Sequence, residues 1–184
     1  MKIDNEFEVA RPPDVVWAFF QDVPGVASCL PGAELTEDRG DGTYAGIVSV
    51  KLGPMNATFE GQASLTPDES THSAHLEGKG ADRKGGSRGS VKVDYRLVAT
   101  DSGGTTVIVE ADVSLAGPAA QFGRTGIINE MSNRLVSDFV ACLEAKLEAE
   151  TPEQAAEIEA GEVNGFKLLL ASLVAWLKKI LRRS

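Results

Sequence analysis

The chain has 184 residues, of which 42% are hydrophobic and 24% charged. This length and composition predict one globular core and exclude a collagen-like, disordered or disulfide-stapled chain. The 19 glycines exceed the usual share of about 7% and favour a sheet-rich domain with many tight turns. The formal net charge of −9 argues against a general nucleic-acid-binding protein, which needs a basic surface.

The first predicted elements are a strand and two short helices. Residues 2–9 carry apolar side chains at alternating positions and predict a strand. Pro12 and Pro13 favour a helix start before the apolar run 15–20, because the first helical position needs no N–H donor. Residues 26–30 predict a second short helix.

The middle of the chain changes to a period of two. The stretches 44–52, 58–65, 91–98 and 107–113 alternate between apolar and polar residues, and turns rich in glycine, proline and aspartate separate the strands of this region. With the first strand, this pattern predicts an antiparallel sheet with one buried face.

A long helix is predicted for residues 127–148. Apolar side chains recur in steps of three and four from Ile128 through Met131, Leu135 and Phe139 to Leu147, which gives one apolar stripe. A strongly curved sheet wrapped around this helix is the simplest way to bury both the stripe and the sheet face.

Residues 149–165 and 166–184 differ from the body in charge. The first segment holds five glutamates and no basic residue, and it predicts a solvated, flexible acidic linker with some helical character. Residues 164–184 hold five of the 18 basic residues and no acid, which leaves a net charge of −14 on the rest. Basic residues on one end of an acidic body point to a surface or a partner.

The tail pattern predicts an amphipathic helix over 166–184. Its uncharged run, residues 168–177, is too short to span a membrane, which needs about 20 apolar residues. The pattern favours a helix lying on an anionic membrane surface, where each basic residue adds about 1 kcal/mol. A helix for a partner's groove and a helix packed on this protein's own sheet remain alternatives. The predicted membrane-binding residues are Phe166, Lys167, Leu169, Leu170, Leu173, Trp176, Leu177, Lys178, Lys179, Ile180, Leu181, Arg182 and Arg183.

The two cysteines, Cys29 and Cys142, have no metal-binding or redox-motif spacing. The polar start of the chain, residues 1–6, does not resemble an export signal. We therefore expect a cytoplasmic protein with reduced cysteines. Cys29 is expected to be a buried small thiol rather than a nucleophile.

No constellation of residues predicts catalysis or a metal site. His72 and His75 are expected to be exposed on one strand, where their spacing points them to opposite faces. The glycine-rich basic segment 82–89 lacks the ending of a phosphate-binding loop and predicts either a mobile hairpin loop or a docking or gating loop. We expect no enzymatic activity, no catalytic residue and no covalent cofactor.

Several segments resemble the CoxG family of carbon monoxide dehydrogenase accessory proteins, over about residues 1–148. The most specific is Cys29–Glu34, with the sequence CLPGAE, which follows a short Asp-Val-Pro at residues 22–24. The other matching segments are Phe7–Val9, Pro12–Trp17, Tyr44–Gly46, Val50–Pro54, Phe59–Gly61, Gly117–Pro118 and the long final helix.

This resemblance implies an α+β helix-grip (START-like) fold. In that fold a curved seven-stranded antiparallel sheet wraps around a long C-terminal helix and leaves an apolar cavity, here followed by the amphipathic tail. Small inward residues alternating with large ones agree with a cavity, although simple helix-on-sheet packing explains them as well. Tyr95 is the best inward candidate to donate a hydrogen bond to a carbonyl. The predicted cavity residues are Phe20, Leu30, Val48, Val50, Phe59, Gly61, Ala63, Leu76, Val93, Tyr95, Val109, Ala111, Ile128, Met131 and Leu135.

The resemblance also implies an accessory role beside a molybdenum hydroxylase of the carbon monoxide dehydrogenase type. Together with the tail, it predicts a peripheral protein on the cytoplasmic face of the cell membrane that recruits this enzyme. The expected ligand is an isoprenoid quinone (menaquinone or ubiquinone) or a similar lipid. The alternatives are a membrane anchor or assembly factor without a ligand, and a START-like enzyme acting on an apolar small molecule.

Overall fold

The structure, a computed structural model, describes residues 1–52, 55–124, 127–149 and 151–159, so the predicted tail lies outside the described residues. The strands are β1 (Lys2–Val9), β2 (Ala33–Asp38), β3 (Thr43–Leu52), β4 (Met55–Asp68), β5 (Ser73–Asp82), β6 (Ser87–Ala99) and β7 (Thr105–Ala116). The helices are α1 (Pro13–Gln21), α2 (Val23–Ser28), α3 (Ile127–Glu148) and α4 (Pro152–Ala156), with a 3-10 segment η1 (Gly117–Arg124).

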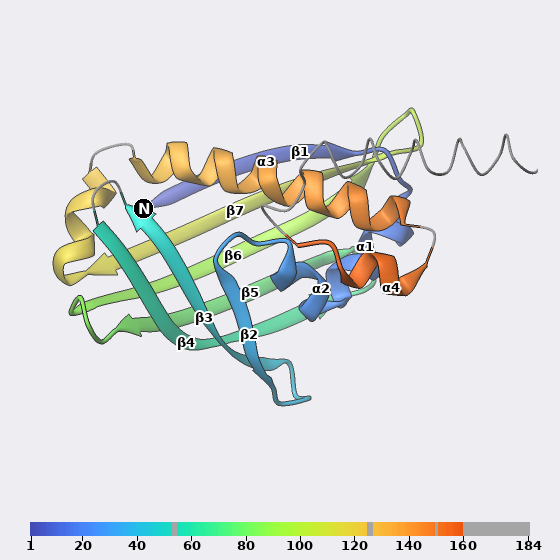
Figure 1. Ribbon diagram of the computed structural model, residues 1–184. Helices are drawn as coiled ribbons and strands as arrows, with labels where there is room; N and C mark the ends of the chain where they lie inside the picture. Colours follow the sequence, from blue (N-terminus) through green and yellow to red (C-terminus); the bar gives the residue numbers. More distant parts are fainter. Residues whose placement is uncertain (53–54, 125–126, 150, 160–184) are drawn as a thin grey trace, which may run out of the picture.

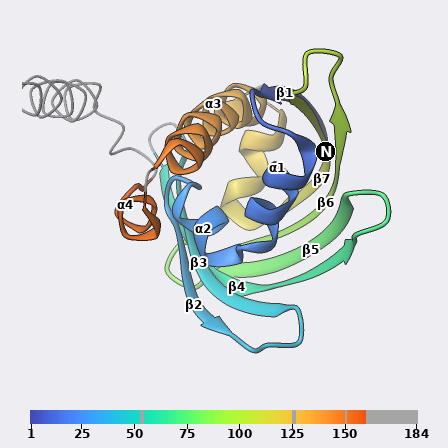
Figure 2. The same ribbon diagram turned by 90° about the vertical axis from the view of Figure 1, so that its right-hand side faces the viewer.

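The seven strands form one sheet in the order β1-β7-β6-β5-β4-β3-β2, and every neighbouring pair is antiparallel. The long helix α3 lies along the concave side of this sheet (Figure 1). Seen from the end, the strands curve around α1, α2 and α3 (Figure 2). This confirms the predicted helix-grip fold, and α3 has the predicted bounds of 127 and 148.

The predicted alternation sets the two faces of the sheet. Cross-strand pairs place Leu65 beside Leu76, Leu76 beside Val93, and Val93 beside Ala111, all with their side chains toward α3. The residues between them carry charged or polar side chains to the outer face, because successive side chains in a strand point to opposite sides. The outer face is therefore polar and the concave face apolar.

A row of glycines crosses the concave face where the sheet bends. Gly46, Gly61, Gly80 and Gly89 are consecutive cross-strand partners in β3, β4, β5 and β6. A Cβ on Gly61 would come within 2.7 Å of the Gly80 Cα, which no real side chain tolerates. The backbones of β4 and β5 thus approach too closely for any residue but glycine.

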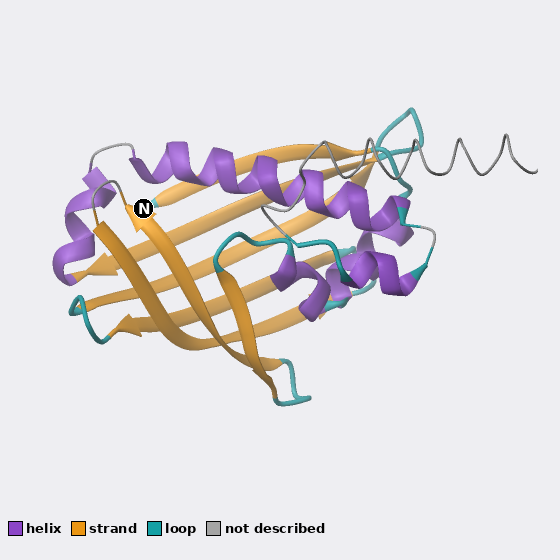
Figure 3. Ribbon diagram, viewed as in Figure 1, coloured by secondary structure: helices purple, strands orange, loops and turns teal. Residues whose placement is uncertain are grey.

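The curved sheet and the helices on its concave side are called the grip below. Buried apolar residues gather in two clusters at its opposite ends. The α1–α2 cluster lies around the first two helices and the C-terminal half of α3, and the η1 cluster lies around η1 and the start of α3. The helical segments at these two ends are purple in Figure 3. The α1–α2 cluster consists of Val9, Val16, Trp17, Phe19, Phe20, Cys29, Ala74, Tyr95, Leu97, Val107, Phe139, Cys142 and Leu143. The η1 cluster consists of Ala119, Phe122 and Ile128, with Val50, Phe59, Leu115 and Met131 packed against it.

The expectation of reduced cysteines is wrong. Cys29 and Cys142 form a disulfide, with Cα atoms 5.4 Å apart and both side chains fully buried. Cys29 ends α2 and Cys142 belongs to the apolar stripe of α3, so the fold brings together two residues separated by 113 positions. Spacing along the chain carries no signal for such a pair. The bond ties the C-terminal half of α3 to the segment that leads into β2.

The acidic segment after α3 is partly packed on the body. The Nζ atom of Lys146 in α3 donates a hydrogen bond to the Ala155 carbonyl oxygen at 2.8 Å, and burial lowers the pKa of this lysine. Ile158 packs against the α1–α2 cluster. Residues 151–159, which we expected to belong to a flexible linker, therefore include a short helix held against α3.

Candidate functional site

The predicted cavity residues converge on the concave side of the sheet. The ten strand residues among them share the inward face, Ile128, Met131 and Leu135 lie in α3, and Phe20 lies in α1. Leu30 follows α2 and packs against the α1–α2 cluster. The structure thus brings the predicted residues together, while their ligand-binding role stays a prediction.

The middle of this concave face is only partly covered. Between the two clusters the inward side chains are half-buried, and Val48 keeps 44% of its surface exposed. A side chain in a filled core is normally buried, so the helix does not seal this part of the sheet. We call these residues the inner strip: Val48, Gly61, Ala63, Leu76, Gly78, Val91, Val93 and Ala111.

Two polar groups of the concave face are already paired with each other. The Asn5 side-chain amide in β1 donates a hydrogen bond to Ser132 Oγ in α3 at 2.9 Å. This bond links the first strand to the long helix beside the inner strip. Sequence reasoning missed it because Asn5 occupies an inward position of an otherwise apolar pattern.

Tyr95 is another polar residue on this face, and its hydroxyl has no hydrogen-bond partner among the described residues. The side chain is 9% exposed, and its ring lies 5.0 Å from Phe20 and 6.4 Å from Trp17, measured between ring centroids. Burial raises the pKa of Tyr95 to about 12, so the phenol stays protonated and can donate a hydrogen bond.

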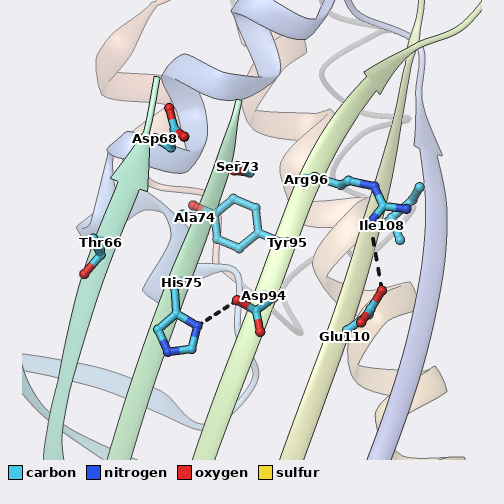
Figure 4. A pocket seen from close by; sticks show the side chains of 10 residues that line it. All are labelled: Thr66, Asp68, Ser73, Ala74, His75, Asp94, Tyr95, Arg96, Ile108 and Glu110. Carbon is cyan, nitrogen blue, oxygen red and sulfur yellow. Dashed lines mark hydrogen bonds and ion pairs between the residues drawn. The ribbon is translucent and has the colours of Figure 1, made fainter. Parts of the chain in front are cut away.

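The outer face of the sheet carries a shallow groove of about 400 Å³. Figure 4 shows His75 and Asp94 directed toward each other there, beside Arg96 and Glu110. His75 Nδ1 lies 2.7 Å from Asp94 Oδ1 and His75 Nε2 lies 3.4 Å from Glu77 Oε1. Both contacts, the one with Asp94 first, raise the pKa of His75 and favour its charged form, which cannot accept a proton.

We expected the two histidines to lie on one strand, and the structure shows that they do not. His75 belongs to β5, whereas His72 lies in the preceding turn with a φ of 45°. The His72 ring stacks on Trp17, with centroids 5.4 Å apart and planes 28° apart. Among the described residues no group of three or more His, Cys, Asp or Glu side chains is placed to hold a metal ion.

The basic turn between β5 and β6 is fixed by an aspartate. Buried Asp82 accepts hydrogen bonds from the backbone N–H groups of Lys84 and Gly85, at 3.0 and 2.9 Å. Arg83 and Lys84 remain exposed at its tip. This turn lies near η1, at the end of the grip opposite α1 (Figure 1).

Comparison with known proteins identifies both a family match and structural neighbours. The family model for CoxG, described as a subunit of carbon monoxide dehydrogenase, matches residues 6–148. No curated protein matches the chain in sequence.

The solved structures show the fold. A conserved protein from Geobacillus kaustophilus is 15% identical with a TM-score of 0.70, covering 80% of this chain and 95% of that chain. The Zhui aromatase/cyclase from Streptomyces sp. R1128 is 18% identical with a TM-score of 0.53, covering 81% and 96%. Norcoclaurine synthase from Thalictrum flavum, in complex with dopamine and hydroxybenzaldehyde, is 18% identical with a TM-score of 0.53, covering 82% and 88%.

In the part of the chain that the structure describes, no helix is both long enough and apolar enough to cross a membrane.

Proposed function

Because the chain belongs to the CoxG family of carbon monoxide dehydrogenase, we propose that it is an accessory protein that recruits a molybdenum hydroxylase to a membrane and holds an apolar ligand. Family membership implies an accessory subunit of carbon monoxide dehydrogenase. Membrane recruitment, ligand binding and the absence of catalysis are the proposed parts.

The observation that carries ligand binding is the inner strip. An apolar surface of this kind, left half-exposed between two buried clusters, costs free energy in water at about 25 cal/mol per Å². A hydrocarbon ligand would remove that surface from water. Binding sites of this type are concave and mostly apolar, with a few polar groups that orient the ligand.

The tail sequence supports membrane recruitment. Residues 166–184 combine an apolar face with five basic residues, a pattern typical of helices that lie in a membrane interface. The protein would then sit on the cytoplasmic face of the cell membrane as a peripheral protein. Its acidic body would be repelled by the anionic lipids that attract the tail.

An isoprenoid quinone is the ligand that would connect ligand binding with membrane recruitment. A dehydrogenase must pass its electrons onward, and quinones are the apolar electron acceptors of membranes. A protein that holds a quinone beside a recruited dehydrogenase would let a soluble enzyme reduce a membrane-borne acceptor. The protein itself would supply binding and position, and the quinone would supply the redox chemistry.

The experiment is extraction of the natively purified full chain with organic solvent, followed by mass spectrometry of the extract. We expect one quinone per protein when the host cell makes that quinone. A blank extract, repeated after incubation with quinone-loaded vesicles, would contradict ligand binding and favour an anchor or assembly factor. A stoichiometric lipid other than a quinone would support the proposed carrier function and identify that lipid, instead of a quinone, as the ligand.

A further inference from the structure

The Tyr95 hydroxyl oxygen is not fully enclosed, although most of the side chain is buried. Every fully enclosed side-chain nitrogen or oxygen of the described residues has a hydrogen-bond partner. Tyr95 is nine-tenths buried, and no hydrogen bond is made by its hydroxyl within the described part of the chain. Its oxygen is therefore not enclosed, and it can meet a small molecule.

Neighbouring residues hold the ring in one place. Phe20 and Trp17 from α1 lie against it, and Ala74 is its cross-strand partner in β5. Figure 4 shows the ring reaching from β6 toward β5, where the small side chain of Ala74 leaves room for it. A phenol fixed in this way loses little conformational freedom when it binds a ligand.

Tyr95 also marks the border between the closed and the open part of the grip. It belongs to the α1–α2 cluster, whereas the next inward residues of the same strand, Val93 and Val91, belong to the half-buried inner strip. From Tyr95 to Gly89 the strand covers about 20 Å at 3.3 Å per residue. An elongated apolar molecule can lie along this distance.

We propose that Tyr95 is the polar anchor of the site and sets the direction of the ligand: its hydroxyl donates a hydrogen bond to an oxygen acceptor on the head group, and the hydrocarbon chain runs along β6 toward η1. This inference rests on the proposed ligand-binding function and adds the specificity. The preferred ligand class is a hydrocarbon chain with a carbonyl on its ring or head, rather than a plain hydrocarbon.

The test compares Tyr95→Phe with a full-length parent chain, and Tyr44→Phe serves as the matched control. Tyr44 is the second of the two tyrosines; it lies in β3 opposite Ala63, so its substitution removes a different hydroxyl from the same face of the sheet. All three proteins carry Trp176→Phe, so that Trp17 is the fluorescent reporter beside Tyr95. The probes are a decyl-substituted benzoquinone, which quenches tryptophan, and decylbenzene, which displaces it without offering a carbonyl.

We expect Tyr95→Phe to weaken quinone binding by about tenfold and to leave the affinity for decylbenzene unchanged. The Tyr44→Phe protein should bind both probes like the parent. Since the Tyr95 hydroxyl makes no bond to the described part of the chain, the Tyr95→Phe variant should fold normally, which thermal unfolding checks.

Equal quinone affinity of parent and Tyr95→Phe would overturn the anchor and leave the proposed carrier function standing. An equal loss of both probes would also overturn it, because it would show a change in shape rather than a lost hydrogen bond. Failure of the parent chain to bind either probe would contradict the carrier function itself, and the anchor with it.

Discussion

The ring of Phe59 lies across the backbone of Gly89: a Cβ built on Gly89 would stand 3.6 Å from Phe59 Cε1. Phe59 is in β4 and Gly89 in β6, two strands away across the concave face. The glycine row therefore does two things. It lets β4 and β5 approach closely. It also leaves space above Gly89 for the Phe59 ring, which packs against the η1 cluster.

Gly61→Ala should destabilise the protein by about 3 kcal/mol or more, because its new methyl group overlaps the backbone of β5. Gly89→Ala is the matched control. Its methyl group would meet Phe59 and Leu115 at 3.4 Å or more, and its stability should stay within about 1 kcal/mol of the parent. Urea unfolding measures both, and equal stabilities of the two variants would contradict the close approach of β4 and β5.

Loss of the disulfide should cost about 2 to 5 kcal/mol, because the bond closes a long loop. The bond joins residues 113 positions apart. The test is Cys29→Ser with Cys142→Ser, followed by urea unfolding of the double variant and of the parent with and without reductant. Alkylation of unfolded, unreduced parent should label no thiol, and two labelled thiols would show that the bond does not form.

The stability contributed by His75 should depend on pH. Its pKa is raised in the folded state by Asp94 and then Glu77, so its contribution is complete below the unfolded pKa of about 6.5 and is lost as the pH rises through the folded value. His75→Asn should therefore be less stable than the parent at about pH 5.5 and equal to it at about pH 9. The side chain is 41% exposed, so the difference should stay below about 1 kcal/mol.

A double-mutant cycle of Asp94→Asn with His75→Asn tests whether the His75–Asp94 pair causes this pH dependence of stability. Coupling that is present at the lower pH and absent at the higher pH is the expected result. A difference between His75→Asn and the parent that does not change with pH would refute the assignment.

Ala63→Phe should fill the inner strip and abolish binding of an apolar ligand, while membrane recruitment is kept. Ser64→Phe is the control, because Ser64 is the next residue in β4 and points to the outer face. Quinone extraction and vesicle sedimentation of both variants separate the two activities. Retention of a stoichiometric ligand in Ala63→Phe would place that ligand elsewhere.

Replacing Lys178, Lys179, Arg182 and Arg183 with glutamate should weaken binding to anionic vesicles by at least about tenfold. Neutral vesicles and a salt series are the controls, since electrostatic attraction to the surface is screened by salt. If the parent chain did not sediment with anionic vesicles, the tail would have to serve a partner groove or its own body instead.

The fold could be predicted because apolar residues repeat at every second position in the strands and in steps of three and four in the long helix. Alternation in β3, β4, β6 and β7 assigned the inward residues correctly, and the stripe in α3 gave both of its ends. These patterns are local, so a single sequence carries them.

Features that depend on two distant segments could not be predicted in this way. The Cys29–Cys142 bond, the Asn5–Ser132 hydrogen bond and the docking of α4 by Lys146 each join residues whose proximity arises only from the folded chain. The same holds for the candidate site. Inward positions followed from alternation, whereas the exposure left between the two clusters depends on how far α3 covers the sheet.

The register shift in β2 affects how copies of this chain behave when they are close together. The pairing of β2 with β3 shifts register between Leu35 and Glu37, and this edge strand exposes Glu34, Glu37 and Asp38. The opposite edge strand, β1, exposes Asp4, Glu6 and Glu8. Two copies meeting edge to edge would bring like charges together across an uneven ladder. Many molecules can therefore accumulate on a small area without joining their sheets into fibres.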